Sequence, residues 1–410
     1  MEKIIQSEIK TNLPGITGGC TRGINPIGKE TSLYLDLVRF LAALAVFISH
    51  VSGGRFTGGF LWQLGRFGSE AVNVFFVLSG FVIAYVVDRR EGTAGDYIVS
   101  RAARIYSVAI PALVLTFILD AVGRAAHPGL YSASWGYSWG NRPEQFFSGL
   151  FFLNQIWFNK IAPGSDLPYW SLGYEVWYYI LFGLVVFAPA KWRVISILAA
   201  LAIMGPKLLS SFPIWLLGVA CYYACTRLVI SRAVGAVLCF GTMGALVAYE
   251  AWVWKMGVPV IHDAAIHTVT RNSLILDDYV IGTLFAIHLA GFHAISRLAA
   301  PVLTGPQAVI RWLAGATFTL YLFHLPVAQF LAAETPWPAG SWANRALLYL
   351  GTFLIILAIA EFTERRKDIW RRGIGVLLHG ASGSLRGLAW HGKNAWNRRQ
   401  LARSHGLKHG

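Results

Sequence analysis

Residues 33–50, LYLDLVRFLAALAVFISH, form an apolar run long enough to cross a membrane as a helix. Asp36, Arg39 and His50 carry ionisable groups in this run, and such groups are costly inside a span, so they mark a functional site by default. The eleven residues from Arg39 to His50 correspond to about three helical turns and roughly 16 Å of rise. This spacing puts both side chains on one helix face, with the guanidinium near one membrane surface and the imidazole towards the other.

The same residues also allow a purely structural interpretation. Asp36 and Arg39 can form an i,i+3 ion pair that eases insertion, and His50 can be an interfacial residue at the end of the span. Spacing alone leaves both interpretations open.

Composition extends the membrane assignment to the whole chain. Of the 410 residues, 55% are hydrophobic and only 13% are charged, which is more apolar than an ordinary soluble surface tolerates. Backbone polar groups cannot face hydrocarbon unpaired, so each crossing requires a helix of about 20 residues. The sequence therefore predicts an all-α polytopic bundle of about ten helices, near residues 33–51, 70–88, 104–122, 170–189, 194–206, 209–226, 233–254, 273–296, 311–331 and 344–364.

Charge predicts the orientation and the domain limits. Arg and Lys gather in alternate connections and at both ends, so both termini are expected on the cytoplasmic side of the membrane. Residues 146–158 are too short and aromatic to cross and are expected to be re-entrant or interfacial. We expect a polar segment at 1–32 without a cleavable signal, a transmembrane domain at 33–364 and a basic tail at 365–410.

The basic tail accounts for most of the excess positive charge. It holds eleven Lys or Arg and one acidic residue, Asp368, for a net charge of +10. A basic segment directly after a span is typical of attraction to anionic lipid headgroups, so membrane lipid is the expected partner. RNA binding is the alternative, and nucleic acid is not the partner we expect.

Two further spans carry residues of interest on the cytoplasmic side. Ser79 and Gly80, in FFVLSGF, allow close approach between helices or to a ligand. Arg101 and Arg104 lie three residues apart at the mouth of the next span, where two guanidiniums can grip a phosphate. Arginines at an inner helix end also obey the positive-inside rule whatever the protein does.

Aromatic and ionisable residues also meet near the outer side. Glu175 lies one turn inside its span beside Trp170 and Tyr174, a combination that suits sugar binding because rings stack on pyranoses and carboxylates accept from hydroxyls. Aromatic belts have the same composition. His324, in YLFHLP, offers a second imidazole, and a lone histidine there can equally be a packing residue.

Several common catalytic signatures are absent from the sequence. We find no nucleotide-binding glycine loop, no paired cysteines with metal spacing and no G-x-S-x-G elbow. We therefore expect no metal site and no permanently bound cofactor, and we expect any chemistry to depend on the polar residues inside the membrane.

Taken together, these residues resemble the acyltransferase-3 family of membrane acyltransferases, many of which O-acetylate bacterial surface polysaccharides. The resemblance runs from about Leu33 to Glu364 and rests on six motifs in order. The motifs are R-x10-H at Arg39 and His50, FFVLSGF at Phe75–Phe81, R-x-x-R at Arg101 and Arg104, WSLGYE at Trp170–Glu175, YLFHLP at Tyr321–Pro326 and FTER at Phe362–Arg365. The resemblance implies that acyl-CoA enters from the cytoplasm and that the acceptor is reached from outside.

The resulting hypothesis assigns a role to each candidate residue. Arg39, Arg101 and Arg104 bind the phosphates of acetyl-CoA or another acyl-CoA, and His50 is the general base on an acceptor hydroxyl. Glu175 is the second catalytic residue, and Trp170, Tyr174 and His324 contact the acceptor. That acceptor is a surface or exported polysaccharide or glycolipid, with polysaccharide assembly proteins as candidate partners.

Two other classes of protein stay open at this level. A proton-coupled transporter or flippase would also line its path with intramembrane Arg, His and Glu. A membrane receptor without catalytic activity is the third class, although the arginine pairs give it no support.

Overall fold

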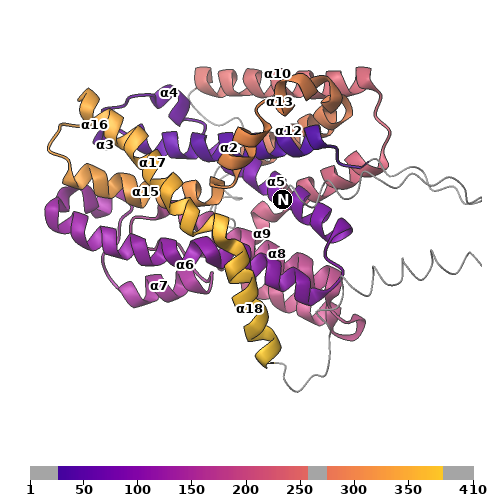
Figure 1. The fold of residues 1–410 in the computed structure, drawn as a ribbon, viewed down its shortest axis with the longest axis horizontal. Helices are drawn as coiled ribbons and strands as arrows, with labels where there is room; N and C mark the ends of the chain where they lie inside the picture. Colours follow the sequence, from indigo (N-terminus) through magenta and orange to yellow (C-terminus); the bar gives the residue numbers. More distant parts are fainter. Residues whose placement is uncertain (1–25, 257–274, 382–410) are drawn as a thin grey trace, which may run out of the picture.

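The computed structural model describes residues 26–256 and 275–381, and within these ranges every regular element is helical (Figure 1). The predicted all-α bundle is confirmed. Expectations for residues 1–25, 257–274 and 382–410 lie outside the described residues.

The described chain contains eight helices long and apolar enough to span a membrane, or nine if one bent pair counts as a span. Seven of these spans contain one long helix each: α2 (Lys29–Val51), α5 (Gly68–Arg89), α6 (Ala94–Ala126), α8 (Trp170–Phe187), α9 (Ala190–Arg227), α10 (Arg232–Met256) and α12 (Ile275–Ile295). The eighth contains three consecutive elements: α16 (Trp342–Ala346), the π-helix η5 (Leu347–Gly351) and α17 (Thr352–Phe362). The bent pair is α14 (Gln307–Ala314) and α15 (Thr317–Glu334), which meet at 54°.

Short helices complete the described chain. They are α3 (Gly54–Thr57), α4 (Trp62–Gly65), η1 (Pro128–Tyr131), η2 (Ala133–Trp135), α7 (Arg142–Leu150), η3 (Leu167–Tyr169), η4 (Ser296–Ala299), α13 (Ala300–Thr304), η6 (Glu364–Arg366) and α18 (Lys367–Ala381).

The count differs from the predicted ten at α9. The two spans predicted at 194–206 and 209–226 form one run of 38 residues, interrupted at Gly205, where φ is 74° and the backbone leaves the helical region. Glycine adopts this left-handed φ at no steric cost, and Pro206 directly follows. The two predicted helices are therefore present, but they are the two halves of one helix that is broken at Gly205.

The segment at 146–158 does not form a spanning helix. Helix α7 ends at Leu150, and the irregular chain that follows packs against the break in α9. The Trp157 N–H donates to the Met204 carbonyl at 2.9 Å, and the buried Lys207 ammonium donates to Gln155 Oε1 at 2.5 Å. Irregular backbone is tolerated at membrane depth where protein covers it, so a re-entrant segment agrees with this packing.

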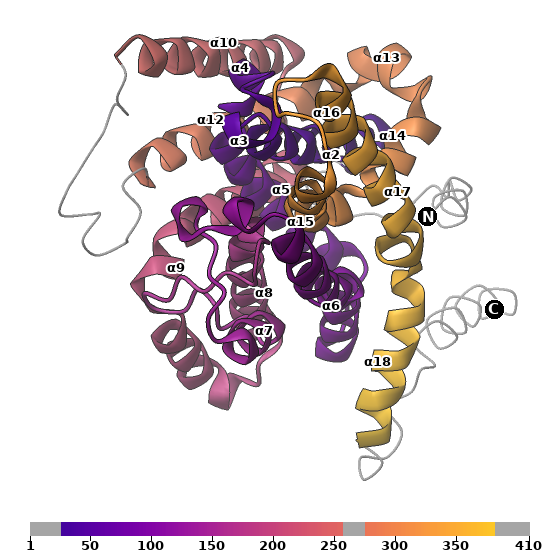
Figure 2. The same cartoon turned by 90° about the vertical axis from the view of Figure 1, so that its left-hand side faces the viewer.

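Helix α5 lies at the centre of the bundle, in contact with α9, α2, α12 and α8. Helix α15 packs against α6, α2 and α17, so α2 and α15 are neighbours. Figure 2 views the molecule from the end at which α3, α15 and α16 lie in front. The contact between α2 and α15 brings together two segments that are far apart in the sequence.

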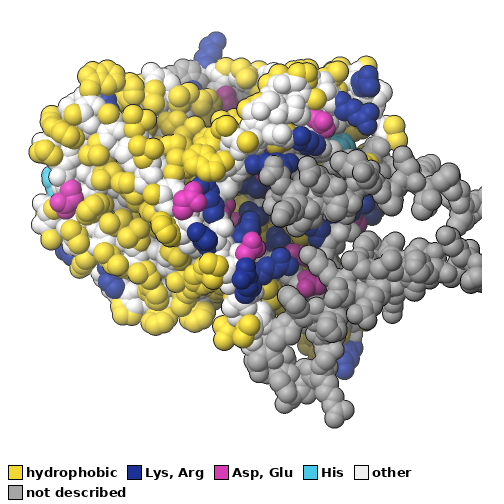
Figure 3. All heavy atoms as spheres, viewed as in Figure 1, with side chains coloured by type: hydrophobic (Ala, Val, Ile, Leu, Met, Phe, Trp, Pro, Cys, Tyr) yellow, Lys and Arg dark blue, Asp and Glu magenta, His cyan; other side chains and the backbone are white. Residues whose placement is uncertain are grey.

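The surface carries the apolar side chains that lipid would cover. Leu198 on α9, Val237 and Phe240 on α10 and Leu354 on α17 are each at least 59% exposed. In Figure 3, hydrophobic side chains cover much of the left part of the face, while Lys and Arg gather towards the right, near α18. A broad apolar surface with charge gathered at one end is typical of a protein that spans a bilayer.

Candidate active site

Helix α2 presents both Arg39 and His50 to the same neighbour, α15. Arg39 lines a cavity whose wall includes Phe318 and Tyr321 of α15, and His50 contacts His324 of α15. The predicted common face of the two side chains is therefore present. Arg39 also lies 3.7 Å from Asp36, so the ion pair proposed as the structural alternative exists alongside the cavity.

The two imidazoles form a directional pair. His324 is fully buried, and its Nδ1 lies 2.9 Å from the Leu320 carbonyl, which only accepts, so this nitrogen carries a hydrogen. Its Nε2 then has a free lone pair and accepts from His50 Nδ1 at 3.2 Å. The Val46 carbonyl, 3.0 Å from the same His50 nitrogen, requires the same tautomer. In this network Nε2 of the half-buried His50 is left without a hydrogen and can act as a base.

The cavity itself is narrow, with a volume of about 50 Å³, and lies between α2, α5, α6, α8 and α15. Polar side chains lie at several positions along this cavity, and aromatic and aliphatic side chains form the rest of its wall. The polar side chains are Arg39, Ser79, Arg104, Ser171, Glu175, Thr317, Tyr321 and Glu364. Two guanidiniums, Arg39 and Arg104, therefore open into one cavity from two different helices.

Glu364 closes the arginine end of the cavity and caps α15. Its Oε2 accepts from the backbone N–H groups of Phe318 and Thr319 at 2.9 and 3.1 Å. Helix α15 has no side-chain cap of its own at Ala316, so a carboxylate from the end of the last span satisfies its free N–H groups. Glu364 thus fixes the start of the helix that carries His324.

Glu175 lies in a hydrogen-bonded network of the wall. Ser79 Oγ donates to Glu175 Oε1 at 3.0 Å, and the Tyr179 hydroxyl donates to the same oxygen. Trp215 Nε1 donates to Ser79 Oγ at 3.2 Å. These bonds hold Glu175 towards α5 rather than towards His50, so its predicted catalytic role stays a prediction.

Tyr321 separates the cavity from the histidine pair. Its hydroxyl lies 2.7 Å from Ser171 Oγ, and its ring is edge-on to His324 with centroids 6.4 Å apart. His50 itself is not among the residues that line the cavity. A group that moves from the arginine end towards His50 has to pass the Tyr321 side chain.

Besides His50 and His324, three predicted site residues lie outside the cavity lining. Arg101 forms an ion pair with the buried Glu91 at 3.1 Å and does not line the cavity. Trp170 is 37% exposed, whereas Tyr174 is buried against Phe76. Their assignments to CoA phosphates and to the acceptor stay predictions that this arrangement does not favour.

The sequence motifs contained residues whose roles were not predicted. Tyr321 and Glu364 belong to the YLFHLP and FTER motifs, and an ionisable residue at the end of the last apolar run was the available signal for Glu364. Ser171 and Ser79 likewise lie inside motifs. In the part of the chain that the structure describes, no group of three or more His, Cys, Asp or Glu is placed to hold a metal ion.

The fold and the site define a class: a polytopic membrane protein with two arginines in an intramembrane cavity and a histidine pair beside it. The chain matches the acyltransferase-3 family, described as an acyltransferase domain, over residues 32–361, and it belongs to that family. It is a membrane acyltransferase.

Two curated relatives have informative names. The chain is 31% identical over 190 residues to the acyltransferase MdmB of Streptomyces mycarofaciens, which covers 43% of this chain and 46% of MdmB. It is 25% identical over 341 residues to the exopolysaccharide production protein ExoZ of Rhizobium meliloti (strain 1021), which covers 75% of this chain and 90% of ExoZ. No solved structure matches the chain.

Proposed function

We propose that this chain transfers an acetyl group from acetyl-CoA to a hydroxyl of a polysaccharide or glycolipid that is exported or lies on the cell surface. The enzyme would act in the bacterial inner membrane. The observation that carries the proposal is the cavity beside α2, with Arg39 and Arg104 at one end and the His50–His324 pair beyond the other. The proposed reaction needs the arginines to bind the phosphates of the donor and the histidine pair to activate the acceptor hydroxyl.

The donor enters at the arginine end, which faces the cytoplasm. Arg39 and Arg104 bind phosphate oxygens of acyl-CoA, because a guanidinium pairs bidentately with phosphate and stays charged. The pantetheine arm follows the cavity wall past Ser79 and Glu175. Rotation of Tyr321 then lets the thioester reach His50.

His50 acts as the general base on the acceptor. Nε2 takes the proton from the acceptor hydroxyl, and the oxygen forms a bond to the thioester carbonyl carbon. The tetrahedral intermediate collapses with cleavage of the carbon–sulfur bond, and the departing thiolate takes the proton from the imidazolium. The products are the O-acyl ester and free CoA thiol, and His50 returns to its starting tautomer.

The names of the relatives and the position of the histidine pair support the proposed acceptor class. ExoZ is named for exopolysaccharide production and MdmB as an acyltransferase. The histidine pair lies at the C-terminal end of α2, beyond Arg39 in the middle of that helix, so an exported glycan reaches it from outside.

Replacement of His50 by alanine tests this proposal. In membranes supplied with labelled acetyl-CoA and a polysaccharide extract, His50→Ala should lower acyl transfer and thiol release by at least about 10²-fold, the usual contribution of a general base. His293→Ala is the control, because His293 on α12 bonds to Thr31 away from the cavity. Activity retained in His50→Ala would remove His50 from the mechanism.

The same preparation separates the enzyme from a transporter. An acyltransferase releases CoA thiol and modifies the glycan, whereas a transporter or flippase moves intact solute without thiol release. Uptake of solute without thiol release would replace the proposed function with transport.

A further inference from the structure

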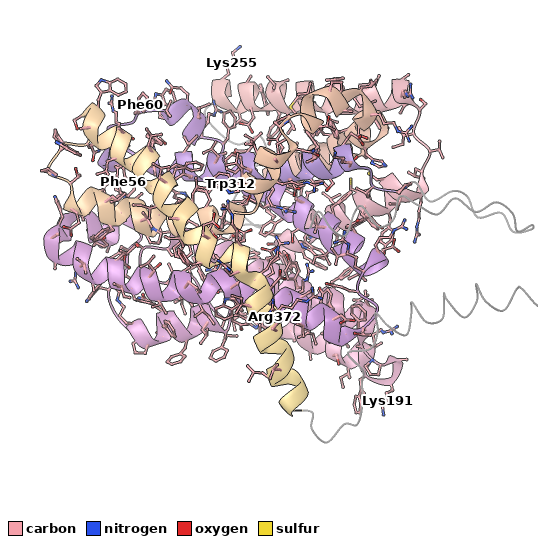
Figure 4. All side chains as sticks on the ribbon, in the orientation of Figure 1. Phe56, Phe60, Lys191, Lys255, Trp312 and Arg372 are labelled. Carbon is pink, nitrogen blue, oxygen red and sulfur yellow. The ribbon has the colours of Figure 1, made fainter. Side chains whose placement is uncertain are left out.

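A second cavity, of about 450 Å³, opens beyond the histidine pair. It lies between α3, the chain before η1, the end of α15 and the loop into α16, and its lining includes Arg55, Phe56, His127, Leu130, Trp337 and Asn344. Figure 4 labels Phe56 towards the left of the molecule, whereas Lys191 lies at the lower right. We call this cavity the outer pocket.

Hydrogen bonds hold the walls of the outer pocket in place. Asn344 Nδ2 donates to the Phe56 carbonyl at 2.7 Å, and Arg345 Nε donates to the Thr57 carbonyl at 3.1 Å. From α15, Gln329 donates to the Leu130 carbonyl. A site whose walls are fixed by such bonds is pre-organised for a ligand.

Arg55 is the notable charge in the outer pocket. Its guanidinium lies over the rings of Phe56 at 4.2 Å and Trp135 at 4.8 Å. Among the described residues it makes one hydrogen bond, from Nη1 to the Leu130 carbonyl at 3.4 Å, and no ion pair. A guanidinium has five N–H donors, so most of its hydrogen-bonding capacity is available to a ligand.

Burial makes this unpaired charge costly. Desolvation lowers the pKa of Arg55 to about 10, which still leaves the group charged at neutral pH. An anion bound in the outer pocket would offset that cost, because a buried charge is stabilised by a hydrogen-bonded partner of opposite sign.

The outer pocket is next to the proposed base. Arg55 follows His50 by five residues, and its charge acts electrostatically on that imidazole. Helix α15 carries His324 in the pair and Ala332 in the pocket wall. An acceptor anchored at Arg55 would therefore present its hydroxyls in the direction of His50.

We propose that the outer pocket binds the acceptor through an anionic group, paired with Arg55 while Trp337 stacks on a sugar ring. This rests on the proposed function, because it names the class of acceptor for the same reaction. A carboxylate of an acidic sugar and a phosphate of a lipid-linked sugar share the required chemistry.

Binding measurements on the full chain in nanodiscs of neutral lipid test the assignment and distinguish the two sources. One pair of probes is a hexuronate-containing oligosaccharide and its carboxyl-reduced counterpart. The other pair is a polyprenyl-diphosphate-linked sugar and the same sugar on neutral polyprenol. In one of the pairs the wild-type chain should bind the anionic member at least tenfold more tightly.

Arg55→Gln should abolish that preference, and Arg55→Lys should keep part of it by retaining the charge. Arg124→Gln is the matched control, because Arg124 is also stacked on a ring, Trp139, but does not line the outer pocket. Equal binding of both members in both pairs by the wild-type chain, or an unchanged preference in Arg55→Gln, would overturn the assignment.

Thiol release from acyl-CoA, measured on the same samples, keeps the two proposals apart. Selective binding without thiol release would contradict acyl transfer and leave the outer pocket as an anion site. Thiol release without selective binding would contradict the role of Arg55 and leave acyl transfer in place.

Discussion

His50 and His324 lie 274 residues apart in the sequence, yet His324 helps to set the tautomer of His50. The Leu320 carbonyl orients His324, and His324 in turn orients His50, so the free lone pair faces away from the pair. This is a positioning role, because His324 acts through His50 rather than on the substrate. The full burial of His324 agrees better with this positioning role than with the acceptor contact predicted from the sequence.

Replacement of His324 tests the positioning role. His324→Ala should lower kcat by about 10- to 100-fold and leave the KM for acyl-CoA unchanged, because orienting partners of functional histidines have effects of this size. His324→Gln, which can supply an amide oxygen to the His50 N–H, should recover part of the loss. A KM effect with normal kcat would instead assign His324 to substrate binding.

The two arginines of the R-x-x-R motif should differ in effect. Arg104→Ala should raise the KM for acyl-CoA by roughly 10- to 100-fold, the value of a hydrogen bond to a charged group. Arg101→Ala, the matched control, should have a smaller effect on KM because Arg101 is already paired with Glu91. Steady-state kinetics with varied acyl-CoA compare them, and equal effects would show that both arginines reach the donor.

Spacing indicated part of the cavity wall and could not indicate the rest. Arg39, Arg104 and Glu175 do line one cavity, because their motifs place them on the inward faces of long helices. The sequence could not show that Arg101 and Arg104 have different surroundings, because Glu91, the partner of Arg101, comes from the turn before the helix. Likewise, no local pattern indicates that His50 and His324 meet, because only the packing of α2 on α15 brings them together.

At the scale of elements, the contact between α5 and α9 supports the cavity wall. Gly80 faces the Trp215 carbonyl, and Gly218 faces the Val77 carbonyl, so a Cβ at either glycine would collide with backbone. Small residues allow membrane helices to approach this closely. The same contact places Trp215 against Ser79, which binds Glu175.

A single methyl group should disturb this contact. Gly80→Ala should destabilise the protein by about 1–3 kcal/mol, the usual cost of overpacking. Gly241→Ala on α10 is the matched control, because a Cβ there meets nothing within 4 Å, and it should be neutral or stabilising. Thermal unfolding in detergent compares the two, and equal stability would contradict the close packing.

Most spans were predictable because each is a long apolar run bounded by charge or glycine. The breaks were harder to predict. The hydrophobic periodicity of the sequence predicts neither the left-handed φ of Gly205 nor the 54° bend between α14 and α15. The Gly205–Pro206 pair is, however, a local turn signal. These interruptions depend on tertiary contacts, such as that of Trp157 with Met204.

At the scale of the whole molecule, two cavities lie on either side of the histidine pair. The cavity with Arg39 and Arg104 is suited to a phosphate-bearing donor, and the outer pocket with Arg55 is suited to the acceptor. Under the proposed function, the two substrates would approach His50 from opposite membrane surfaces, so neither would have to cross the bilayer.

The side from which acyl-CoA is consumed tests this arrangement most directly. Sealed inside-out and right-side-out vesicles containing the protein and a glycan acceptor would be given external acetyl-CoA, which does not cross the bilayer, and thiol release would be recorded. We predict His50-dependent release only in inside-out vesicles, where the end with Arg39 and Arg104 faces the medium. Release from right-side-out vesicles alone, or equally from both, would contradict the account.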